Sequence, residues 1–222
     1  GRPVWWRPRR GGGAVAARAC SGGGIPRGMG GMAGVGGPPD QGLRQAMTSC
    51  SRHRGPDDHG FLAHPCASLG MRRLAIIDIE GGQQPIGNED GKVQCVYNGE
   101  IYNYRELREE LEAKGHRFRT KSDTEVIVHG YEEWGPECFA RFNGMWAVAL
   151  LDDRKTGPRL LLARDHFGIK PLYHARADDR LLWGSEVKSL FQERKLRTAP
   201  SRQRIHDYLS VGFHDNVPDP FF

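Results

Sequence analysis

Apolar positions recur along the chain with two different spacings, and these spacings predict where strands and helices lie. Short apolar runs bounded by glycine, proline or aspartate predict strands at residues 32–35, 67–71, 74–77, 93–97, 145–152, 159–164, 172–175 and 181–184. Apolar positions at i, i+3 and i+4 predict helices at residues 40–52, 104–114, 124–134 and 201–210. Strand pairs joined by short turns, with helices grouped between them, favour an α+β domain with antiparallel sheets.

Capping residues mark the ends of several predicted helices. Asp40 and Asn103 are expected to cap the first and second helices, and Gly115 stands where the second helix should end. Residues 146–151 are apolar without alternation, which predicts a strand covered on both faces, as in stacked sheets flanked by helices.

Basic residues are concentrated at the start of the chain. Residues 1–28 hold six arginines, eight glycines and no acidic residue, which predicts a disordered leader. Without those six charges the formal net charge of +5 becomes −1, so no nucleic-acid partner is expected for the rest of the chain. Three interpretations of the leader stay open: sequence upstream of a start at Met29, a targeting peptide, or an RNA-binding tail.

The cysteine count and the hydropathy exclude several classes of protein. The five cysteines form no CxxC motif, so neither a zinc site nor any other metal site is expected, and free thiols in the cytoplasm are predicted. No stretch approaches the roughly 20 apolar residues that a membrane helix needs, so no membrane partner is expected either.

Three polar positions at element boundaries carry candidate chemistry. Asn98-Gly99 follows a predicted strand and could form an oxyanion hole, although the same dipeptide is the strongest short signal for a hairpin turn. Arg73 could hold a carboxylate bidentately or be an arginine at the core edge. Asp123 could bind an amine or only cap the helix that follows. Residue types alone leave these alternatives open.

These positions belong to seven motifs that form one pattern along the chain. The motifs are residues 29–34, 53–58, 72–78, 97–103, 122–125, 164–173 and 185–188. From about residue 29 to Phe222, the chain resembles the N-terminal glutaminase domain of glutamine-hydrolysing asparagine synthetases, a class II glutamine amidotransferase of the N-terminal-nucleophile type. The resemblance implies a four-layer αββα sandwich of two antiparallel sheets flanked by helices.

The resemblance also implies a role for each matching residue. Arg73 would hold the α-carboxylate of glutamine, and Asp123 its α-amino group. Asn98 and Gly99 would form the oxyanion hole. The full glutamine-binding set that the resemblance implies is Arg73, Leu74, Ala75, Ile76, Ile77, Asn98, Gly99, Glu100 and Asp123. A zwitterionic amino acid needs one fixed cation and one fixed anion, which Arg73 and Asp123 provide.

The sequence departs from the family at its most reactive position. In the family, an N-terminal cysteine attacks the glutamine amide, and its own α-amino group acts as the base. Here Gly30 stands at the nucleophile position and has no side chain with which to attack. Cys20 lies outside the strand-like run and is not expected to replace the missing thiol. The domain is therefore predicted to be inactive as written.

The resemblance also implies domain boundaries, cofactors and partners for this chain. Residues 29–200 are predicted to form the amidotransferase domain, and residues 201–222 to begin a linker toward an ATP-dependent synthetase domain. No cofactor is expected in the amidotransferase domain, and ATP and magnesium are implied only for the synthetase domain. The implied partners are glutamine, that synthetase domain in cis, and a second copy in a homodimer.

Three functions compete at this point. The chain could be an enzyme fragment that releases ammonia from glutamine for amide transfer to aspartate in asparagine biosynthesis. It could be a non-catalytic glutamine-binding or regulatory module. It could also be an RNA-associated protein that acts through its leader.

Overall fold

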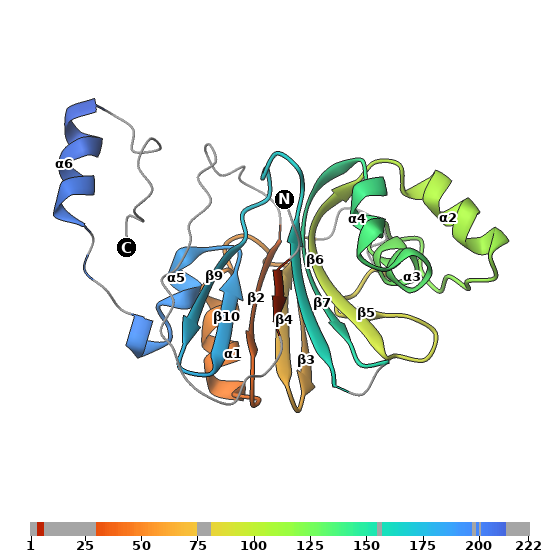
Figure 1. Ribbon diagram of the computed structural model, residues 1–222, viewed down its shortest axis with the longest axis horizontal. Helices are drawn as coiled ribbons and strands as arrows, with labels where there is room; N and C mark the ends of the chain where they lie inside the picture. The colour runs from red at the N-terminus through yellow and green to blue at the C-terminus, as the bar shows by residue number, and fades with distance from the viewer. Residues whose placement is uncertain are drawn as a thin grey trace.

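The computed structural model describes residues 4–6, 30–74, 81–154, 157–196, 199 and 201–211, which form two five-stranded antiparallel sheets and their covering helices (Figure 1). The first sheet has the strand order β1 (Val4–Trp6), β8 (Arg159–Arg164), β7 (Gly144–Asp152), β6 (Val93–Ile101) and β5 (Ile86–Gly87). The second has the order β3 (Asp58–His64), β4 (Ala67–Arg73), β2 (Gly31–Gly36), β10 (Arg180–Gly184) and β9 (Tyr173–Ala177). The helices are α1 (Gln41–Ser49), α2 (Tyr104–Ala113), α3 (Glu125–Trp134), α4 (Cys138–Arg141), α5 (Val187–Leu190) and α6 (Arg202–Val211), with 3-10 turns at Gly135–Glu137 and Arg194–Leu196.

Strand β7 shows why the first sheet is covered on both faces. Successive side chains of a strand point to opposite faces. Trp146 and Leu150 therefore pack toward the helices, in a core cluster that includes Val126 of α3. Ala147 and Leu151 pack on the other face, in a core cluster shared with the second sheet. The continuous apolar run of β7 thus fills two cores, as its lack of alternation predicts.

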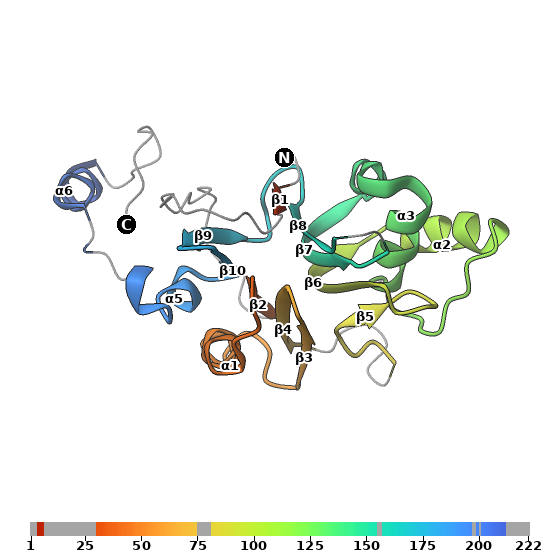
Figure 2. The ribbon, with the colours of Figure 1, turned by 60° about the horizontal axis from the view of Figure 1, so that its bottom comes forward.

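The outer face of the second sheet is covered by a separate helix layer. Met47 of α1 and Leu190 of α5 pack there with Val35 of β2 and Leu182 of β10. The layers therefore run from helices through two sheets to helices, and Figures 1 and 2 show α6 set apart from them. The α+β class and the predicted αββα sandwich are confirmed.

Two of the predicted helix ends are formed as expected. The carboxylate of Asp40 accepts a hydrogen bond from the backbone N–H of Leu43 at 2.9 Å, which caps α1. Gly115 follows α2 with a φ of +100°, a conformation that glycine adopts without strain. The N–H of His116 then donates to the carbonyl of Leu111 at 3.1 Å, as in a Schellman turn.

Two other capping interpretations are wrong. The residue that precedes α3 is Thr124, and the carboxylate of Asp123 accepts hydrogen bonds from β6 instead of from the helix. Asn103 precedes α2 but makes no capping hydrogen bond. Its side chain instead donates to the carbonyl of Arg141 at 3.0 Å and accepts from the N–H of Asn143 at 2.9 Å. Asn103 therefore joins the start of α2 to the segment before β7.

Strand assignments differ from the prediction in several places. β6 continues past Tyr97 to Ile101, so Asn98-Gly99 lies inside a paired strand and the hairpin-turn alternative is wrong. No strand was predicted at the two-residue β5 or at β3, whose side chains are mostly polar or half-exposed. Leu74 follows β4 and does not begin a new strand, while the rest of the strand predicted there, residues 75–77, lies outside the described residues.

The predicted leader is described only in part. Val4–Trp6 form β1, which pairs antiparallel with β8, so these three residues have regular structure. The remaining residues of 1–28, with Cys20 among them, lie outside the part of the chain that the structure describes. Within the described part, no helix has the length and apolar content needed to span a bilayer.

Candidate functional site

A pocket opens where the ends of β4 and β6 lie beside the start of α3. The residues that line it are Gly30, Met71, Arg73, Leu74, Gly82, Gln84, Tyr97, Asn98, Gly99, Glu100, Ser122, Asp123 and Thr124. The set includes predicted site residues from four separate segments of the chain, namely Gly30, Arg73, Leu74, Asn98, Gly99, Glu100 and Asp123. The other predicted site residues, Ala75, Ile76 and Ile77, lie outside the described residues.

Asn98 is the most informative side chain in this pocket. It sits in the paired part of β6, opposite Ala147 of β7, and is 2% exposed. Neither its amide nitrogen nor its amide oxygen has a hydrogen-bond partner among the described residues. A buried polar group without a partner costs about 1–3 kcal/mol. An unpaired amide at the wall of a pocket is therefore suited to bind a polar ligand.

Close packing against the neighbouring strand β7 requires a glycine at position 99. A Cβ at this position would lie 2.2 Å from the carbonyl oxygen of Met145 and 2.6 Å from the Cα of Trp146. Real Cβ atoms do not approach backbone atoms so closely, so only glycine allows β6 and β7 to pair here. The sequence interpretation, in which the missing side chain admits a ligand, did not anticipate this role in strand packing.

Asp123 brings a buried negative charge to the pocket. Its Oδ2 accepts hydrogen bonds from the hydroxyl of Tyr97 at 2.9 Å and from the backbone N–H of Ile101 at 3.0 Å. Burial raises the pKa of the Asp123 carboxyl, and the two hydrogen bonds oppose this rise. The same burial, reinforced by the charge of Asp123, raises the pKa of Tyr97 well above its usual value.

Arg73 brings the opposite charge. It is the last residue of β4 and is 6% exposed, while Asp123 is 5% exposed. Arginine and aspartate are almost never fully buried unless they are paired. A pocket that contains one buried cation and one buried anion is suited to a small zwitterion. Glu100, which is half-buried, adds a further carboxylate to the same wall.

Gly30 lies immediately before β2, at the position predicted for a nucleophile. A Cβ there would lie 2.6 Å from the carbonyl oxygen of Arg72 and 2.6 Å from the Cε of Met71. The end of the Met71 side chain can move, but the Arg72 carbonyl belongs to the backbone of β4. A larger residue at position 30 therefore requires the start of β2 to shift.

The start of β2 is held in place by two motifs, residues 53–58 and 185–188. Residue types alone had suggested no role for either motif. Arg54 donates from Nε to the carbonyl of Gly30 at 3.4 Å and from Nη1 to Oε1 of Glu186 at 3.3 Å. His53 Nε2 lies 2.9 Å from the same Glu186 oxygen, and the hydroxyl of Ser185 accepts the N–H of Met32 at 3.1 Å. Segments 53–58 and 185–188 thus fix the position of Gly30 and of the first residues of β2 by hydrogen bonds.

Sequence reasoning missed several residues that line the pocket. Gln84 accepts the backbone N–H of Tyr97 through its Oε1 at 2.7 Å, and no motif in the sequence marks this glutamine. Three of them, Tyr97, Ser122 and Thr124, are adjacent in sequence to the predicted site residues Asn98 and Asp123. Their membership of the same motifs could have predicted that they line the pocket. Only the fold shows that the Tyr97 hydroxyl reaches Asp123.

The order of the layers defines the fold. The fold is that of the N-terminal-nucleophile hydrolases. It is shared with the glutamine phosphoribosylpyrophosphate amidotransferase of Bacillus subtilis complexed with ADP and GMP, with a TM-score of 0.62 and 20% identity. The similarity covers 72% of this chain and 43% of that one.

Sequence similarity identifies the family. Residues 28–222 match the glutamine amidotransferase domain, and the chain belongs to that family. Asparagine synthetase (glutamine-hydrolysing) 1 of Bacillus subtilis is 43% identical over 80% of this chain and 27% of its own length. Asparagine synthetase (glutamine-hydrolysing) 2 of Arabidopsis thaliana is 49% identical over 63% of this chain and 24% of its own length. The chain thus spans about a quarter of these curated relatives.

Proposed function

We propose that this chain binds glutamine in the pocket between β4, β6 and α3, as the glutamine-binding part of an asparagine synthetase-like protein. The observation that carries the proposal is the buried amide of Asn98, which has no hydrogen-bond partner among the described residues. It shares the pocket with buried Arg73 and Asp123. Glutamine carries a carboxylate, an ammonium and an amide, one group for each of these three side chains.

Each proposed contact between glutamine and the pocket has a physical reason. The guanidinium of Arg73 can bind the α-carboxylate with two parallel hydrogen bonds, and Asp123 can accept from the α-ammonium. The amide of Asn98 and the backbone at Gly99 would then face the side-chain carbonyl of glutamine, where negative charge develops during hydrolysis. Leu74 offers apolar surface to the methylene groups of glutamine, and the resemblance extends this surface to residues 75–77.

The hydrolysis carried out in the family requires a nucleophile at position 30. A cysteine there, with residues 1–29 removed so that its α-amino group is free, would pass its thiol proton to that amine and attack the side-chain carbonyl carbon of glutamine. The C–N bond would break, ammonia would leave with that proton, and a thioester would remain. Water would then release glutamate and regenerate the thiol. Gly30 cannot form this bond, so we infer that the chain as written binds glutamine without cleaving it.

The wider context is part of the same proposal. The curated relatives are named as glutamine-hydrolysing asparagine synthetases, and this chain matches about a quarter of their length. In such a protein the ammonia would pass to an ATP-dependent synthetase domain in cis, where ATP and magnesium would bind and aspartate would accept the amide. The family resemblance alone supports a homodimer.

A second candidate function uses the same pocket. Gly30 favours a non-catalytic glutamine-binding or regulatory module, because such a module needs the binding side chains and not the nucleophile. Both candidates bind glutamine without cleaving it while Gly30 is present. They differ in whether the pocket still contains the rest of a glutaminase site: release of ammonia by a Gly30→Cys chain with a free N-terminus would favour the enzyme, and binding without release would favour the module.

Calorimetry with L-glutamine tests the proposal. The chain should bind glutamine, and Asp123→Asn should weaken binding about 10- to 100-fold, because a hydrogen bond to a charged group is worth about 1.5–3 kcal/mol. Asp179→Asn, an exposed aspartate between β9 and β10, is the matched control and should bind normally. A folded chain that gives no heat at millimolar glutamine would overturn the proposal, as would equal affinity in the Asp123→Asn variant.

A further inference from the structure

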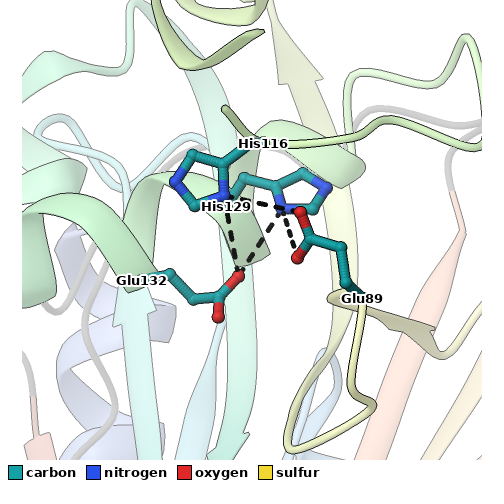
Figure 3. Close-up of side chains that lie close together, drawn as sticks. All are labelled: Glu89, His116, His129 and Glu132. Atoms are coloured by element: carbon teal, nitrogen blue, oxygen red, sulfur yellow. Dashed lines mark ion pairs between the residues drawn. The ribbon is translucent and has the colours of Figure 1, made fainter. Parts of the chain in front are cut away.

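Four potential metal ligands converge at a place that does not belong to the glutamine pocket. Glu89 follows β5, His116 follows α2, and His129 and Glu132 lie one turn apart on α3. One ligand atom from each of the four lies within 4.8 Å of the others. Figure 3 shows the two imidazole rings and the two carboxylates facing a common point.

The separations within this cluster are close to those of a tetrahedral site. Nδ1 of His129 lies 3.4 Å from Oε2 of Glu89 and 3.5 Å from Oε2 of Glu132. Nδ1 of His116 lies 3.6 Å from Oε1 of Glu89 and 3.9 Å from Oε2 of Glu132. A tetrahedral zinc ion with bonds of about 2.0–2.1 Å holds its ligand atoms about 3.3–3.4 Å apart. These four pairs lie within about half an ångström of that spacing, and the four ligand atoms all lie within 4.8 Å of one another.

Two of the converging atoms lack hydrogen bonds although they are buried. His129 is fully buried, and its Nδ1 forms no hydrogen bond within the described part of the chain. The same holds for Oε2 of Glu132. Buried polar atoms are nearly always satisfied, yet within the described part of the chain these two take part in ion pairs of 3.4–3.9 Å, which are longer than good hydrogen bonds. A bound cation accounts for both, because each has a lone pair to donate.

The opposite nitrogen of each ring faces a carboxylate. Nε2 of His129 lies 3.5 Å from Oε1 of Glu125, and Nε2 of His116 lies 3.7 Å from Oε2 of Glu133. Histidine ligands of metals usually donate their second N–H to such a carboxylate, which fixes the tautomer and leaves the other nitrogen free to bind. Both rings therefore present Nδ1 to the centre of the cluster.

The ligand carboxylates are held in place as well. Oε1 of Glu132 accepts a hydrogen bond from the side-chain amide of Asn88 at 2.7 Å. Oε1 of Glu89 accepts the backbone N–H of Arg117 at 2.9 Å. Oε2 of Glu132 is directed toward both imidazoles, whereas Glu89 directs Oε2 toward His129 and its held Oε1 toward His116. All four ligands are thus oriented from outside the cluster, as in a preorganised metal site.

We propose that Glu89, His116, His129 and Glu132 bind one Zn²⁺ ion in a closed, structural site. Two carboxylates and two neutral imidazoles carry a net charge of −2, which the ion neutralises. Imidazole ligands favour zinc over magnesium and calcium, which prefer oxygen ligands. Four protein ligands leave no open position for a substrate. The ion joins the β5–β6 turn, the end of α2, and α3, and Thr124, which immediately precedes α3, lines the glutamine pocket.

This site departs from the sequence expectation that no metal is bound. That expectation rested on the absence of paired cysteines, and the ligands here are histidines and glutamates from three separate elements. Only the two α3 residues are close in sequence, so the cluster exists only in the fold. In the competing arrangement the histidines are protonated and form ion pairs with the carboxylates. The chain then binds no zinc, and added zinc does not raise its melting temperature.

Zinc analysis of the whole chain separates the two arrangements. The protein is stripped with a chelator, given Zn²⁺ and freed of loose metal by gel filtration. Bound zinc is then counted by mass spectrometry, and the melting temperature is measured with and without zinc. The test variants are His116→Gln and Glu89→Gln, whose side chains are only partly buried, and Glu133→Gln, which removes an orienting carboxylate. The matched control is His59→Gln, an exposed histidine on β3.

The expected result is one zinc ion per chain and a higher melting temperature in the unmodified protein and in His59→Gln. His116→Gln and Glu89→Gln should lose both effects, while Glu133→Gln should bind about 10- to 100-fold more weakly, as for the loss of an orienting partner. If a ligand variant fails to fold, the zinc affinity of Glu133→Gln tests the proposal instead: weaker binding than in the unmodified chain supports it, and equal binding contradicts it. Equal zinc in every variant, or none in the unmodified chain, would overturn the proposal.

Discussion

The hydroxyl of Tyr97 donates a hydrogen bond to Oδ2 of Asp123 across 2.9 Å, and the backbone N–H of Ile101 donates to the same oxygen at 3.0 Å. Residues of β6 thus fix the carboxylate that stands before α3. Burial raises the pKa of this carboxyl. The pocket therefore contains an oriented anion that is less stable, in the absence of a ligand, than an aspartate in water.

Replacing Asp123 by asparagine should stabilise the fold while it weakens glutamine binding. A carboxyl whose pKa is raised in the folded state contributes stability below its unfolded pKa of about 3.9, and that contribution is lost as pH rises through the folded pKa. At neutral pH the buried charge is therefore unfavourable, and Asp123→Asn should unfold at higher urea concentration than the unmodified chain. The difference should shrink near pH 4. A less stable variant at neutral pH would contradict this account.

The hydroxyl of Tyr97 should set the acid limit of glutamine binding. The hydrogen bond from Tyr97 stabilises the ionised form of Asp123, so Tyr97→Phe should raise the pKa of Asp123 further. Calorimetry as a function of pH should then show binding that fails at a higher pH than in the unmodified chain. Tyr208→Phe, an exposed tyrosine on α6, is the control. Identical pH profiles in all three proteins would exclude a role for this hydrogen bond.

Two buried asparagines should respond oppositely to the same substitution. Asn98→Leu removes an amide that has no partner among the described residues, so stability should stay unchanged or rise by up to about 1–3 kcal/mol while glutamine binding weakens. Asn88 is equally buried, but its side chain bonds Asp90, Glu132 and the N–H of Val93. Asn88→Leu should therefore cost about 1–3 kcal/mol for each buried partner left unpaired. Urea denaturation measures both, and a large loss in Asn98→Leu would mean that its amide is already satisfied.

Gly99 should tolerate no side chain. A Cβ would lie 2.2 Å from the Met145 carbonyl, so Gly99→Ala must separate β6 from β7 and should cost about 1–3 kcal/mol or more, as overpacking does. Among the described residues, a Cβ on Gly42 of α1 would meet only Oδ1 of Asp40, at 3.7 Å. Gly42→Ala should stabilise the chain by about 0.5–1 kcal/mol through helix propensity. Comparable stability of the two variants would show that β6 and β7 can adjust.

The sequence predicted the layers well because the apolar patterns of the strands and helices were strong. β7 was recognised because its continuous apolar run fills the cores on both of its faces. β3 was missed because it has few apolar residues and none of its residues is fully buried, and local pattern does not reveal its pairing with β4. The hydrogen bonds of Asn103 and Asp123 were misjudged because tertiary partners replaced the local capping that both residues favour in isolation.

The site was predicted unevenly for a similar reason. Residues in recognisable motifs, such as Arg73 and Asn98, could be assigned by resemblance, and the structure brings those within its described part into one pocket. Gln84 and the four-residue metal cluster carry no local signal. Their roles depend on contacts between segments that are distant in sequence, and such contacts appear only once the sheets and helices have packed.

Restoring the nucleophile tests the central claim most directly. The measurement is ammonia release from L-glutamine by a Gly30→Cys chain that begins at residue 30, with a Gly30→Ala chain of the same length as control. The free N-terminus should let the start of β2 shift away from the Arg72 carbonyl, which a Cβ would otherwise meet at 2.6 Å. Glutamine binding is measured in parallel on both chains.

The account predicts ammonia and glutamate from Gly30→Cys, none from Gly30→Ala, and glutamine binding by both. Adding Asn98→Ala to the cysteine chain should lower turnover about 100- to 1,000-fold, as expected for loss of an oxyanion donor. A Gly30→Cys chain that folds and binds glutamine yet releases no ammonia would contradict the claim that the pocket is a glutaminase site lacking only its nucleophile.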